Sequence, residues 1–217
     1  MSVIKPTESQ LRSEIIATGQ KLFDRDFVAA TSGNISLRLD SGLFLVTPSN
    51  MSKGSMKEED ILVVDGAGKV RFGRRKLTSE FLMHRRIYER RPDVCAVVHA
   101  HPPIATGFAC AGISLDQAIA AEAILALGKV PLAPYATPGT PEVPESLDPY
   151  IGESGAILLA NHGVVAYGRD LAEAFGRMEI VEHYAKITLV AKLLGRQQIL
   201  SQDEIAKLMG ARSAYFK

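Results

Sequence analysis

Three of the five histidines in this chain follow directly on apolar runs. His99 and His101 close the segment 95–101, and His162 comes just after the apolar run Ala156–Ala160. Side chains two residues apart on a strand point to the same face, so an extended segment presents both imidazoles of the pair together. Imidazole is a favoured zinc ligand, and three histidines leave one position of the ion open for a substrate. The spacing therefore predicts a catalytic metal site.

A His-x-His pair has a second interpretation, as two polar residues that merely end a strand. The concentration of histidines at the ends of apolar runs favours the metal site over that interpretation. The remaining two histidines, His84 and His183, fall inside helical patterns and are expected to be ordinary helix residues.

The composition is that of a globular protein with balanced charge. The chain has 217 residues, 47% hydrophobic and 23% charged, with a net charge of +1, and we expect a single domain over residues 1–217. This charge gives no reason to expect a nucleic acid or an anionic membrane as partner. No apolar run approaches the roughly 20 residues of a membrane span, and residues 1–10 lack the apolar stretch of a signal peptide. Cys95 and Cys110 lie in apolar surroundings, so we expect buried thiols and a cytoplasmic location.

The first third of the chain predicts one helix and a series of short strands. Thr7 and Gln10 form a capping-box pattern that opens a helix ending near Asp26. Alternating apolar residues separated by turn signals then predict four strands, over 35–39, 43–46, 61–64 and 69–72. Two polar turns, 31–34 and 47–50, lie next to these strands.

A helix is expected from the segment Leu77–Glu80 through about Arg90, with Thr78 or Ser79 as its N-cap. A helix start with free N–H groups and hydroxyls is suited to bind phosphate, although most such residues only cap. Glu80 has two interpretations, as a first-turn carboxylate favoured by the helix dipole or as a site residue.

The second half of the chain mixes helices and strands. Ser114 with Gln117 predicts the start of an Ala-rich helix that ends near Gly128, in which Glu122 either faces solvent or reaches the site. Asp170 opens the longest helix, which Gly195 closes. The other elements expected are strands over 130–136, 156–160 and 164–167, a short helix over 144–150, and a last helix from Ser201 to Gly210. Strands with few intervening helices favour a largely antiparallel sheet covered by helices.

Six motifs in this order resemble the class II aldolase/adducin N-terminal family, and within it the members similar to L-fuculose-1-phosphate aldolase. The resemblance runs through nearly the whole chain, and the order of the six motifs makes it specific. They are Thr31–Ser36, Thr47–Ser49, Leu77–Glu80, Val97–His101, Pro134–Thr140 and Asn161–Gly163.

The resemblance implies a role for particular residues. His99, His101 and His162 would be the zinc ligands, and Glu80 would be the catalytic acid/base that also ligates zinc when no substrate is bound. The family has a three-layer α/β fold, with helices on both faces of a largely antiparallel sheet, and usually forms a four-fold homotetramer with sites at subunit interfaces. The positions implied to hold the substrate phosphate are Gly33, Asn34, Ser49, Asn50, Thr78 and Ser79.

The chain departs from the family pattern at three places. Ser49-Asn50 replaces the usual Thr-Gly, and Thr78-Ser79 replaces the usual Ser-Ser, so both loops keep a hydroxyl. The segment 117–122 lacks the tyrosine that handles the aldehyde half in fuculose aldolases. Tyr215 is the candidate for the C-terminal tyrosine that acts as proton donor in those enzymes.

Together these features predict cleavage of a ketose 1-phosphate to dihydroxyacetone phosphate and an aldehyde, with zinc as Lewis acid. The same scaffold also supports 4-epimerases, which carry Asp where this chain has Glu80, and dehydratases, for which Glu122 is the candidate acid/base. Decarboxylases of sugar-acid phosphates are a further branch. Non-catalytic adducin-like scaffolds are the alternative outside enzymes, and the complete histidine set argues against that alternative.

Overall fold

The computed structural model describes the backbone of residues 6–215 and the side chains of residues 6–211. Within these residues eight strands form one sheet, in the order β4-β3-β2-β1-β5-β8-β7-β6. All neighbouring strands pair antiparallel except β6 and β7, which are parallel. The strands are β1 (Asn34–Arg38), β2 (Phe44–Val46), β3 (Leu62–Val64), β4 (Val70–Phe72), β5 (Ala96–Ala100), β6 (Leu132–Ala133), β7 (Ala156–Leu159) and β8 (Gly163–Gly168).

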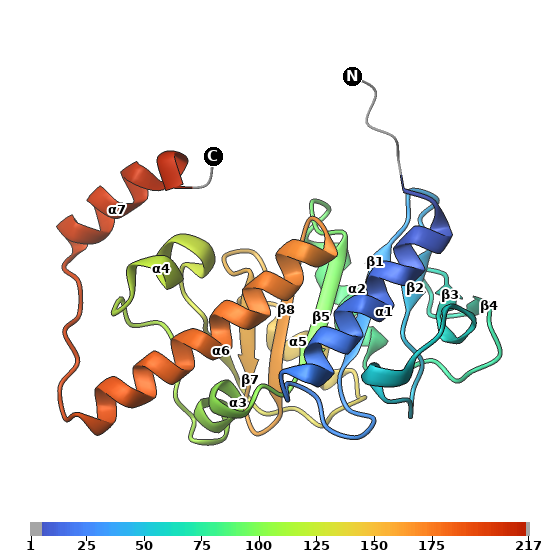
Figure 1. Cartoon of the computed structure of the whole chain (residues 1–217), viewed down its shortest axis with the longest axis horizontal. Coiled ribbons are helices and arrows are strands. Elements are labelled where there is room, and N and C mark those ends of the chain that lie inside the picture. The colour runs from blue at the N-terminus through green and yellow to red at the C-terminus, as the bar shows by residue number, and fades with distance from the viewer. Residues whose placement is uncertain (1–5, 216–217) are drawn as a thin grey trace.

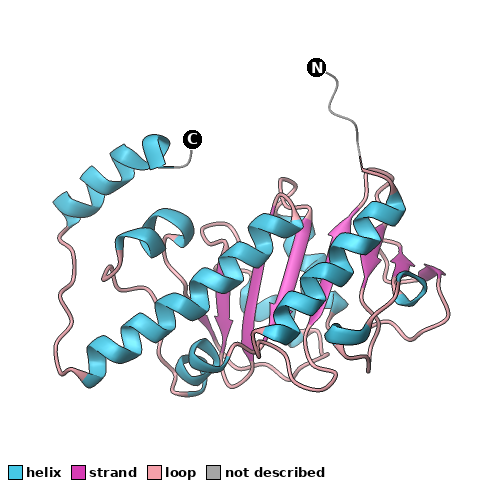
Figure 2. Cartoon of the chain, viewed as in Figure 1, coloured by secondary structure: helices cyan, strands magenta, loops and turns pink. Residues whose placement is uncertain are grey.

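Helices cover both faces of this sheet, so the expected three-layer α/β architecture is confirmed (Figures 1 and 2). Helices α1 and α6 lie across one face, and α2 and α5 lie behind the other (Figure 1). None of the described helices is long and apolar enough to cross a membrane. The helices are α1 (Glu8–Asp24), α2 (Phe81–Arg90), α3 (Pro103–Cys110), α4 (Ala121–Leu127), α5 (Glu142–Leu147), α6 (Leu171–Leu193) and α7 (Gln202–Tyr215).

The central strand β5 sends alternate side chains into two separate cores. Ala96, Val98 and Ala100 join the core beneath α1 and α6. Val97 joins the core beneath α2 and α5, and strand alternation places His99 on that same face. A fully buried strand of this kind explains why the segment contains an almost unbroken apolar run.

Several helix ends follow the capping signals in the sequence. Thr7 and Gln10 form the predicted capping box of α1. Asp170 caps α6 by accepting a hydrogen bond from Glu173 N, and Gly195 follows the end of that helix at φ +78°. These local signals were sufficient because their partners lie within four residues in the sequence.

Four predicted elements were wrong in extent. The helix expected from Ser114 begins only at α4, since Leu115 pairs with Val130 and holds this stretch extended. The strand over 130–136 shrinks to β6, and the helix over 144–150 becomes α5, which begins two residues earlier and ends at Leu147. The last helix, α7, continues past Gly210, because a glycine within a helix is unfavourable by only about 1 kcal/mol.

Two further expectations need correction. Helix α3 was not predicted at all, and its backbone donors Ile104 N and Ala105 N are satisfied by the carboxylate of Glu182 on α6, far away in the sequence. The cysteines are not buried thiols: Cys110 is exposed and Cys95 half-buried, and both are free. Cys110 is the last residue of α3 and lies on its outer surface, which the apolar sequence context does not show.

Candidate metal centre

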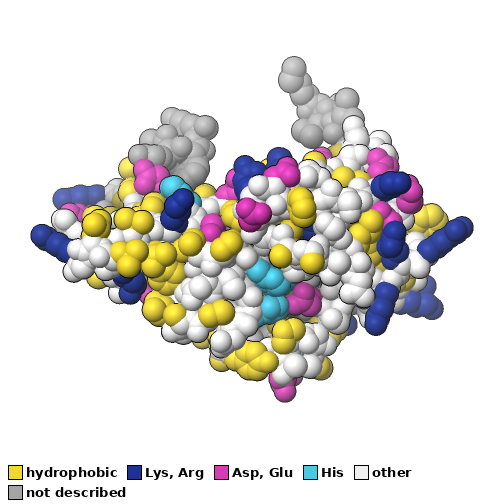
Figure 3. Space-filling model, turned by 60° about the horizontal axis from the view of Figure 1, so that its bottom comes forward, with side chains coloured by type: hydrophobic (Ala, Val, Ile, Leu, Met, Phe, Trp, Pro, Cys, Tyr) yellow, Lys and Arg dark blue, Asp and Glu magenta, His cyan; other side chains and the backbone are white. Residues whose placement is uncertain are grey.

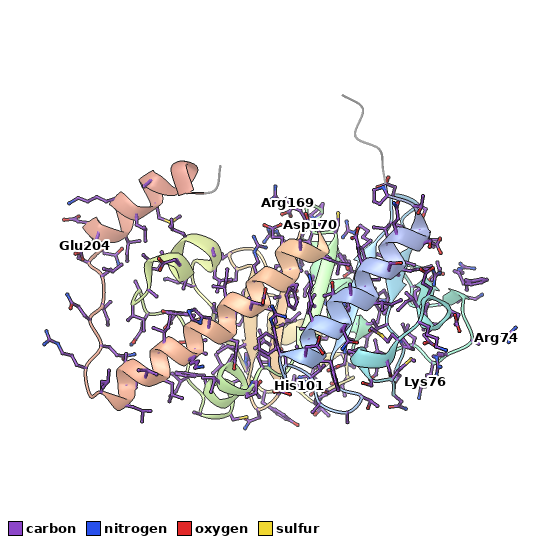
Figure 4. The ribbon with its side chains drawn as sticks, in the orientation of Figure 1. Arg74, Lys76, His101, Arg169, Asp170 and Glu204 are labelled. Carbon is purple, nitrogen blue, oxygen red and sulfur yellow. The ribbon has the colours of Figure 1, made fainter. Side chains whose placement is uncertain are left out.

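The three predicted histidines meet at one end of the sheet, where β5 ends and β8 begins. Each offers one nitrogen to a group whose atoms all lie within 4.8 Å of one another, so the cluster could hold a metal ion. The Nε2 atoms of His99 and His101 are 3.1 Å apart. Figure 3 shows histidine side chains next to an acidic group at the middle of one face of the molecule. In Figure 4, His101 lies at the opposite end of the sheet from Arg169 and Asp170.

The protonation of His99 prepares it to be a ligand. Its Nδ1 lies 2.9 Å from the carbonyl oxygen of Val164, and because a carbonyl only accepts hydrogen bonds, Nδ1 carries the proton. Burial lowers the pKa of His99 to about 4, so the ring is neutral at pH 7. The lone pair of Nε2 therefore faces the centre of the cluster, as a metal ligand requires.

Gly163 makes room for His101. A Cβ atom at Gly163 would lie 2.5 Å from Cδ2 of His101 and 2.7 Å from the carbonyl oxygen of Ala100. No side chain larger than hydrogen fits there without moving the ring or the backbone. The His-Gly pair that follows β7 thus has a steric reason, since His162 supplies a nitrogen and the glycine admits a second histidine.

Glu80 completes the donor set. Its Oε1 lies 3.1 Å from Nε2 of His162 and 3.6 Å from Nε2 of His99. Burial by itself raises the pKa of Glu80, but His99, His162 and the amide of Asn34 outweigh it and hold the pKa well below its usual range. Glu80 is therefore a carboxylate at neutral pH.

The start of α2 differs from the predicted cap. Glu80 occupies the N-cap position, and no side chain caps this end. The hydroxyl of Thr78 instead accepts a hydrogen bond of 3.3 Å from Glu80 N, and Ser79 is exposed. Thr78 thereby fixes the backbone of Glu80, which leaves the carboxylate free to face the histidines.

Three imidazole nitrogens lie within 4.8 Å of one another, and one carboxylate oxygen lies 3.1 and 3.6 Å from two of them. This set fits zinc, which takes four nitrogen, sulfur or oxygen ligands in tetrahedral arrangement. A carboxylate that can leave gives way to a substrate oxygen, as an open catalytic position requires. The chemistry of these donors thus fits a catalytic divalent metal.

The loops with the predicted phosphate residues are tied to one another. Ser49 N donates to the carbonyl oxygen of Lys76 at 2.9 Å, next to a bridge between Pro48 and Leu77, and this joins the turn at 47–50 to the start of α2. The ammonium group of Lys53 donates to the carbonyl oxygens of Met51 and Thr31, at 2.6 and 3.2 Å, and this joins the turns at 47–51 and 31–34. Five of the six predicted positions therefore lie on three connected loops, and Asn34 is the first residue of β1.

Two of these positions need an unusual backbone. Gly33 has φ +73°, and a Cβ there would lie 2.9 Å from the carbonyl oxygen of His99. Asn50 has φ +56°, a left-handed conformation that asparagine tolerates better than most residues. An asparagine at this position therefore suits the left-handed backbone that the turn adopts.

Some site features were missed from the sequence. His84 is not an ordinary helix residue: it is fully buried, and its Nε2 lies 2.6 Å from Oδ1 of Asn34. The amide nitrogen of Asn34 in turn donates to Glu80. Lys53 is 1% exposed, and burial lowers its pKa to about 8. The spacing Glu80-x3-His84-x3-Tyr88 on a predicted helix was the available signal for the first of these, because residues four apart share a helix face.

The remaining predicted positions lie elsewhere. Glu122 is exposed in the first turn of α4. The segment 117–122, which lacks the tyrosine, runs along an irregular stretch into α4, and the hydroxyl of Tyr184 on α6 donates to Gln117 O. Tyr215 is the last described residue of α7, and its side chain lies outside the described residues.

Comparison with known proteins places this architecture in a family. Residues 13–189 match the model described as "Class II Aldolase and Adducin N-terminal domain". The match covers well over half of the chain, so the protein belongs to the class II aldolase and adducin family. The similarity expected from the six sequence motifs is confirmed.

Curated relatives and solved structures narrow the class further. The chain is 34% identical to a 5-deoxy-D-ribulose 1-phosphate aldolase of Bacillus thuringiensis serovar kurstaki, over 91% of this chain and 92% of that protein. It is 34% identical to a 3-oxo-tetronate 4-phosphate decarboxylase of Pectobacterium atrosepticum, over 93% and 94% of the two chains. A solved L-fuculose 1-phosphate aldolase superimposes with a TM-score of 0.88 at 35% identity, over 94% and 97%. These similarities support an enzyme of the class II aldolase superfamily that acts on a phosphorylated sugar.

Proposed function

We propose that this protein is a zinc-dependent aldolase that cleaves a ketose 1-phosphate to dihydroxyacetone phosphate and an aldehyde. One observation carries the proposal: three imidazole nitrogens cluster, with a carboxylate next to two of them, and the loop that leads to this carboxylate is one of three loops that are hydrogen-bonded to one another and carry hydroxyls and backbone N–H groups. A metal centre next to an anion-binding set suits a substrate with a carbonyl at one end and a phosphate at the other. His99, His101 and His162 are the proposed ligands.

Each group of residues has its own role in the proposed reaction. The loops that contain Gly33, Ser49 and Ser79 hold the phosphate and so align the bond that breaks. A zinc ion bound to the histidines supplies Lewis-acid polarisation of the substrate carbonyl. Glu80, displaced from the metal side by the substrate, accepts or donates the proton next to the reacting carbon. Thr78 and Asn34 hold the backbone and one carboxylate oxygen of Glu80 while the other oxygen moves.

Three further features belong to the proposal. Tyr215, near the end of α7, is the proposed proton donor for the departing aldehyde. A homotetramer with sites at subunit interfaces would bring such a C-terminal residue to a neighbouring metal centre. The cytoplasm is the proposed compartment, in agreement with the two free thiols Cys95 and Cys110.

A second candidate is the decarboxylation of a 3-oxo sugar-acid phosphate. A relative named as a decarboxylase is as similar to this chain as one named as an aldolase, at 34% identity in both cases. Both reactions break a carbon–carbon bond next to a polarised carbonyl, and only the leaving fragment differs. The absence of a tyrosine in the segment 117–122 fits a leaving group other than an aldehyde. Dehydration and epimerisation are less well supported. Glu122, the candidate acid/base of a dehydratase, is exposed. Epimerases carry Asp at the position of Glu80.

The deciding experiment offers zinc-loaded protein a panel of substrates. Release of dihydroxyacetone phosphate is measured from the 1-phosphates of fuculose, rhamnulose, ribulose, 5-deoxyribulose and methylthioribulose, and release of carbon dioxide from 3-oxo-tetronate 4-phosphate. We expect dihydroxyacetone phosphate from at least one ketose. Carbon dioxide release without any cleavage of the ketoses would replace the first candidate by the second. Zinc-loaded protein that turns over no member of the panel would contradict both.

A further inference from the structure

Helix α2 and strand β1 present polar side chains to each other in a matched series. Glu80 lies at the N-cap of α2, and His84 and Tyr88 follow on the same face at intervals of four residues. Asn34 and Ser36 lie on the facing side of β1, two residues apart. Four helical residues rise about 6.0 Å and two strand residues about 6.6 Å, so the two series stay in step.

These five side chains form one continuous hydrogen-bonded chain. Asn34 Nδ2 lies 2.6 Å from Glu80 Oε2, and Asn34 Oδ1 lies 2.6 Å from His84 Nε2. His84 Nδ1 and the Tyr88 hydroxyl each lie 2.7 Å from Ser36 Oγ. Ser36 and His84 are fully buried, and Asn34 and Tyr88 are each 3% exposed. Polar groups buried at this depth are costly unless every one has a partner, and here the chain supplies the partners.

The direction of every bond follows from the first. Glu80 is ionised and only accepts, so the Asn34 amide nitrogen donates to it, and Asn34 Oδ1 is left to accept from His84 Nε2–H. Burial lowers the pKa of His84 to about 3, so the ring is neutral and its Nδ1 carries a lone pair. Ser36 therefore donates to Nδ1 and accepts from the hydroxyl of Tyr88, whose pKa burial raises above its usual range.

We propose that His84, supported by Ser36 and Tyr88, is a positioning residue whose neutral Nε2–H tautomer orients the Asn34 amide and thereby aims Glu80 at the metal centre. Oε2 of Glu80 is anchored by Asn34, whereas Oε1 faces the histidines at 3.1 and 3.6 Å. A carboxylate held by one oxygen keeps its place when the other oxygen gives way to a substrate. The positioning role rests on the proposed lyase function, whereas the tautomer does not.

The first test reads the tautomer directly and needs no substrate. Nitrogen-15 NMR of the imidazoles is recorded for the metal-free and the zinc-loaded protein, and the His84 signal is assigned as the one missing from His84→Gln. We expect a neutral ring with its proton on Nε2 in both samples between about pH 6 and 8, well above the lowered pKa. A proton on Nδ1, or a charged ring, would overturn the proposal.

The second test measures coupling between His84 and Glu80 through metal affinity, by chelator competition on substrate-free protein. His84→Leu is expected to weaken zinc binding by about 3- to 10-fold, and less than the 10- to 100-fold typical of lost partners next to a ligand. The same change made in the Glu80→Gln variant is expected to have no further effect. Equal losses in both backgrounds would show that His84 acts on the metal centre by another route, and would overturn the proposal.

The third test uses turnover of whichever substrate the panel identifies. His84→Leu is expected to lower kcat by about 10- to 100-fold, as a misaimed acid/base group does, and to change KM by less than about 3-fold. His84→Gln, which places an amide donor near Nε2, should recover most of kcat. Tyr88→Phe should lower kcat by about 2- to 5-fold. Its matched control Tyr167→Phe removes a buried hydroxyl that donates to Ile151 O, and should leave kcat unchanged.

The outcomes separate the positioning role from the proposed function. Unchanged kcat in His84→Leu and Tyr88→Phe, together with unchanged zinc affinity, would overturn the positioning role even if the lyase activity is established. If the panel shows no turnover, the tautomer and the coupled zinc affinity still support or overturn the inference. Should His84→Leu fail to fold, Tyr88→Phe retains the turnover test and His84→Gln the assignment of the tautomer, because both keep the volume of the buried side chain nearly unchanged.

Discussion

The two carboxylate oxygens of Glu80 have different partners. Oε2 accepts a hydrogen bond of 2.6 Å from Asn34, and Oε1 faces His162 at 3.1 Å. Such an anchor keeps the carboxylate in place whether or not its other oxygen binds a metal. The arrangement therefore suits a group that leaves the metal side and then moves a proton.

The Glu80→Gln variant separates metal binding from proton transfer. The three histidines remain, so the variant should keep nearly all of its zinc, whereas kcat should fall by about 10²- to 10⁴-fold because an amide cannot act as a base. Zinc content by metal analysis and turnover of the active panel substrate are the two measurements. Glu145→Gln, at an exposed carboxylate on α5, is the control and should behave as the unmodified protein. Full activity in Glu80→Gln would remove this residue from the mechanism.

Gly163→Ala tests the space that His101 occupies. The added methyl would lie 2.5 Å from Cδ2 of His101, so the ring or the strand must shift. We expect zinc affinity to fall by at least about 10-fold, and stability by about 1–3 kcal/mol, as overpacking of a filled site does. Chelator competition and thermal unfolding report the two effects. Gly152→Ala is the matched control, since a Cβ there meets nothing within 4 Å, and comparable losses in both variants would refute the steric explanation.

At the scale of elements, Lys53 fastens two loops from inside the protein. It lies at the start of the 3-10 turn η1 (Lys53–Ser55), and its ammonium group donates to carbonyl oxygens on both sides. Burial, only partly offset by the charge of Glu80, lowers its pKa to about 8. The folded protein therefore holds a cation at pH 7 in a place that disfavours one, and the two carbonyl contacts stabilise it.

The lowered pKa of Lys53 makes a directional prediction for stability. Between about pH 8 and the ordinary value of 10.5, the unfolded chain binds this proton and the folded protein does not. The free energy of unfolding should therefore rise with pH in this window, by up to about 1.4 kcal/mol per pH unit from this group. Denaturant titrations of the unmodified protein and Lys53→Met at several pH values isolate the effect.

The stability difference should shift in favour of the unmodified protein as the pH rises through that window. Lys129→Met, at an exposed lysine beside α4, is the control and should give a difference that does not change with pH. A pH-independent difference for Lys53→Met as well would mean that the lysine titrates in the folded protein as it does in the unfolded chain.

The sequence predicted those parts of the site that depend on neighbouring residues in the chain or on a recognisable motif. His99 and His101 share a face because strand geometry alone puts residues i and i+2 together, and the family resemblance pointed to Glu80 and the three loops. His84 could not be assigned in this way, because its partner Asn34 lies 50 residues away in the sequence. Its role exists only once α2 packs across β1.

In the fold as well, local features were predicted correctly and features that depend on long-range contacts were not. Capping at Thr7 and Asp170 was read correctly because each signal and its partner lie within one helical turn. The stretch from Ser114 was assigned to a helix because its cap pattern is real, but the pairing of Leu115 with Val130 overrides it. Helix α3 was not predicted from the sequence, since the carboxylate that accepts hydrogen bonds from its first backbone N–H groups belongs to α6.

At the scale of the whole molecule, the metal centre joins segments that are far apart in the chain. Glu80 starts α2, His99 and His101 end β5, and His162 precedes β8. A metal bound across these elements stabilises only the folded arrangement, because the unfolded chain does not hold the ligands together. Binding energy at this point is therefore also energy of folding.

Removal of the metal should consequently lower the melting temperature. Zinc at about 100 times its dissociation constant contributes about 2.7 kcal/mol. For a chain of this length that corresponds to a shift of about 5–11 °C, at 2–4 °C for each kcal/mol. Calorimetry before and after chelation, and after zinc is restored, measures it, with His101→Ala as the variant that should show little response. Identical melting curves with and without zinc would contradict a metal that bridges β5 and β8.

The place of β5 in the sheet has one more consequence. This strand is paired along both edges, with β1 on one side and β8 on the other, and all five of its residues are buried. Its amide protons can exchange with deuterated water only when the whole sheet opens, so the backbone that carries His99 should show the slowest exchange in the molecule. Turns such as 47–50 lie outside the strand pairing, and we expect their amides to exchange sooner. Two of the proposed metal ligands, His99 and His101, thus lie on or next to a strand that should open least, whereas the proposed phosphate-binding turns lie outside the strand pairing.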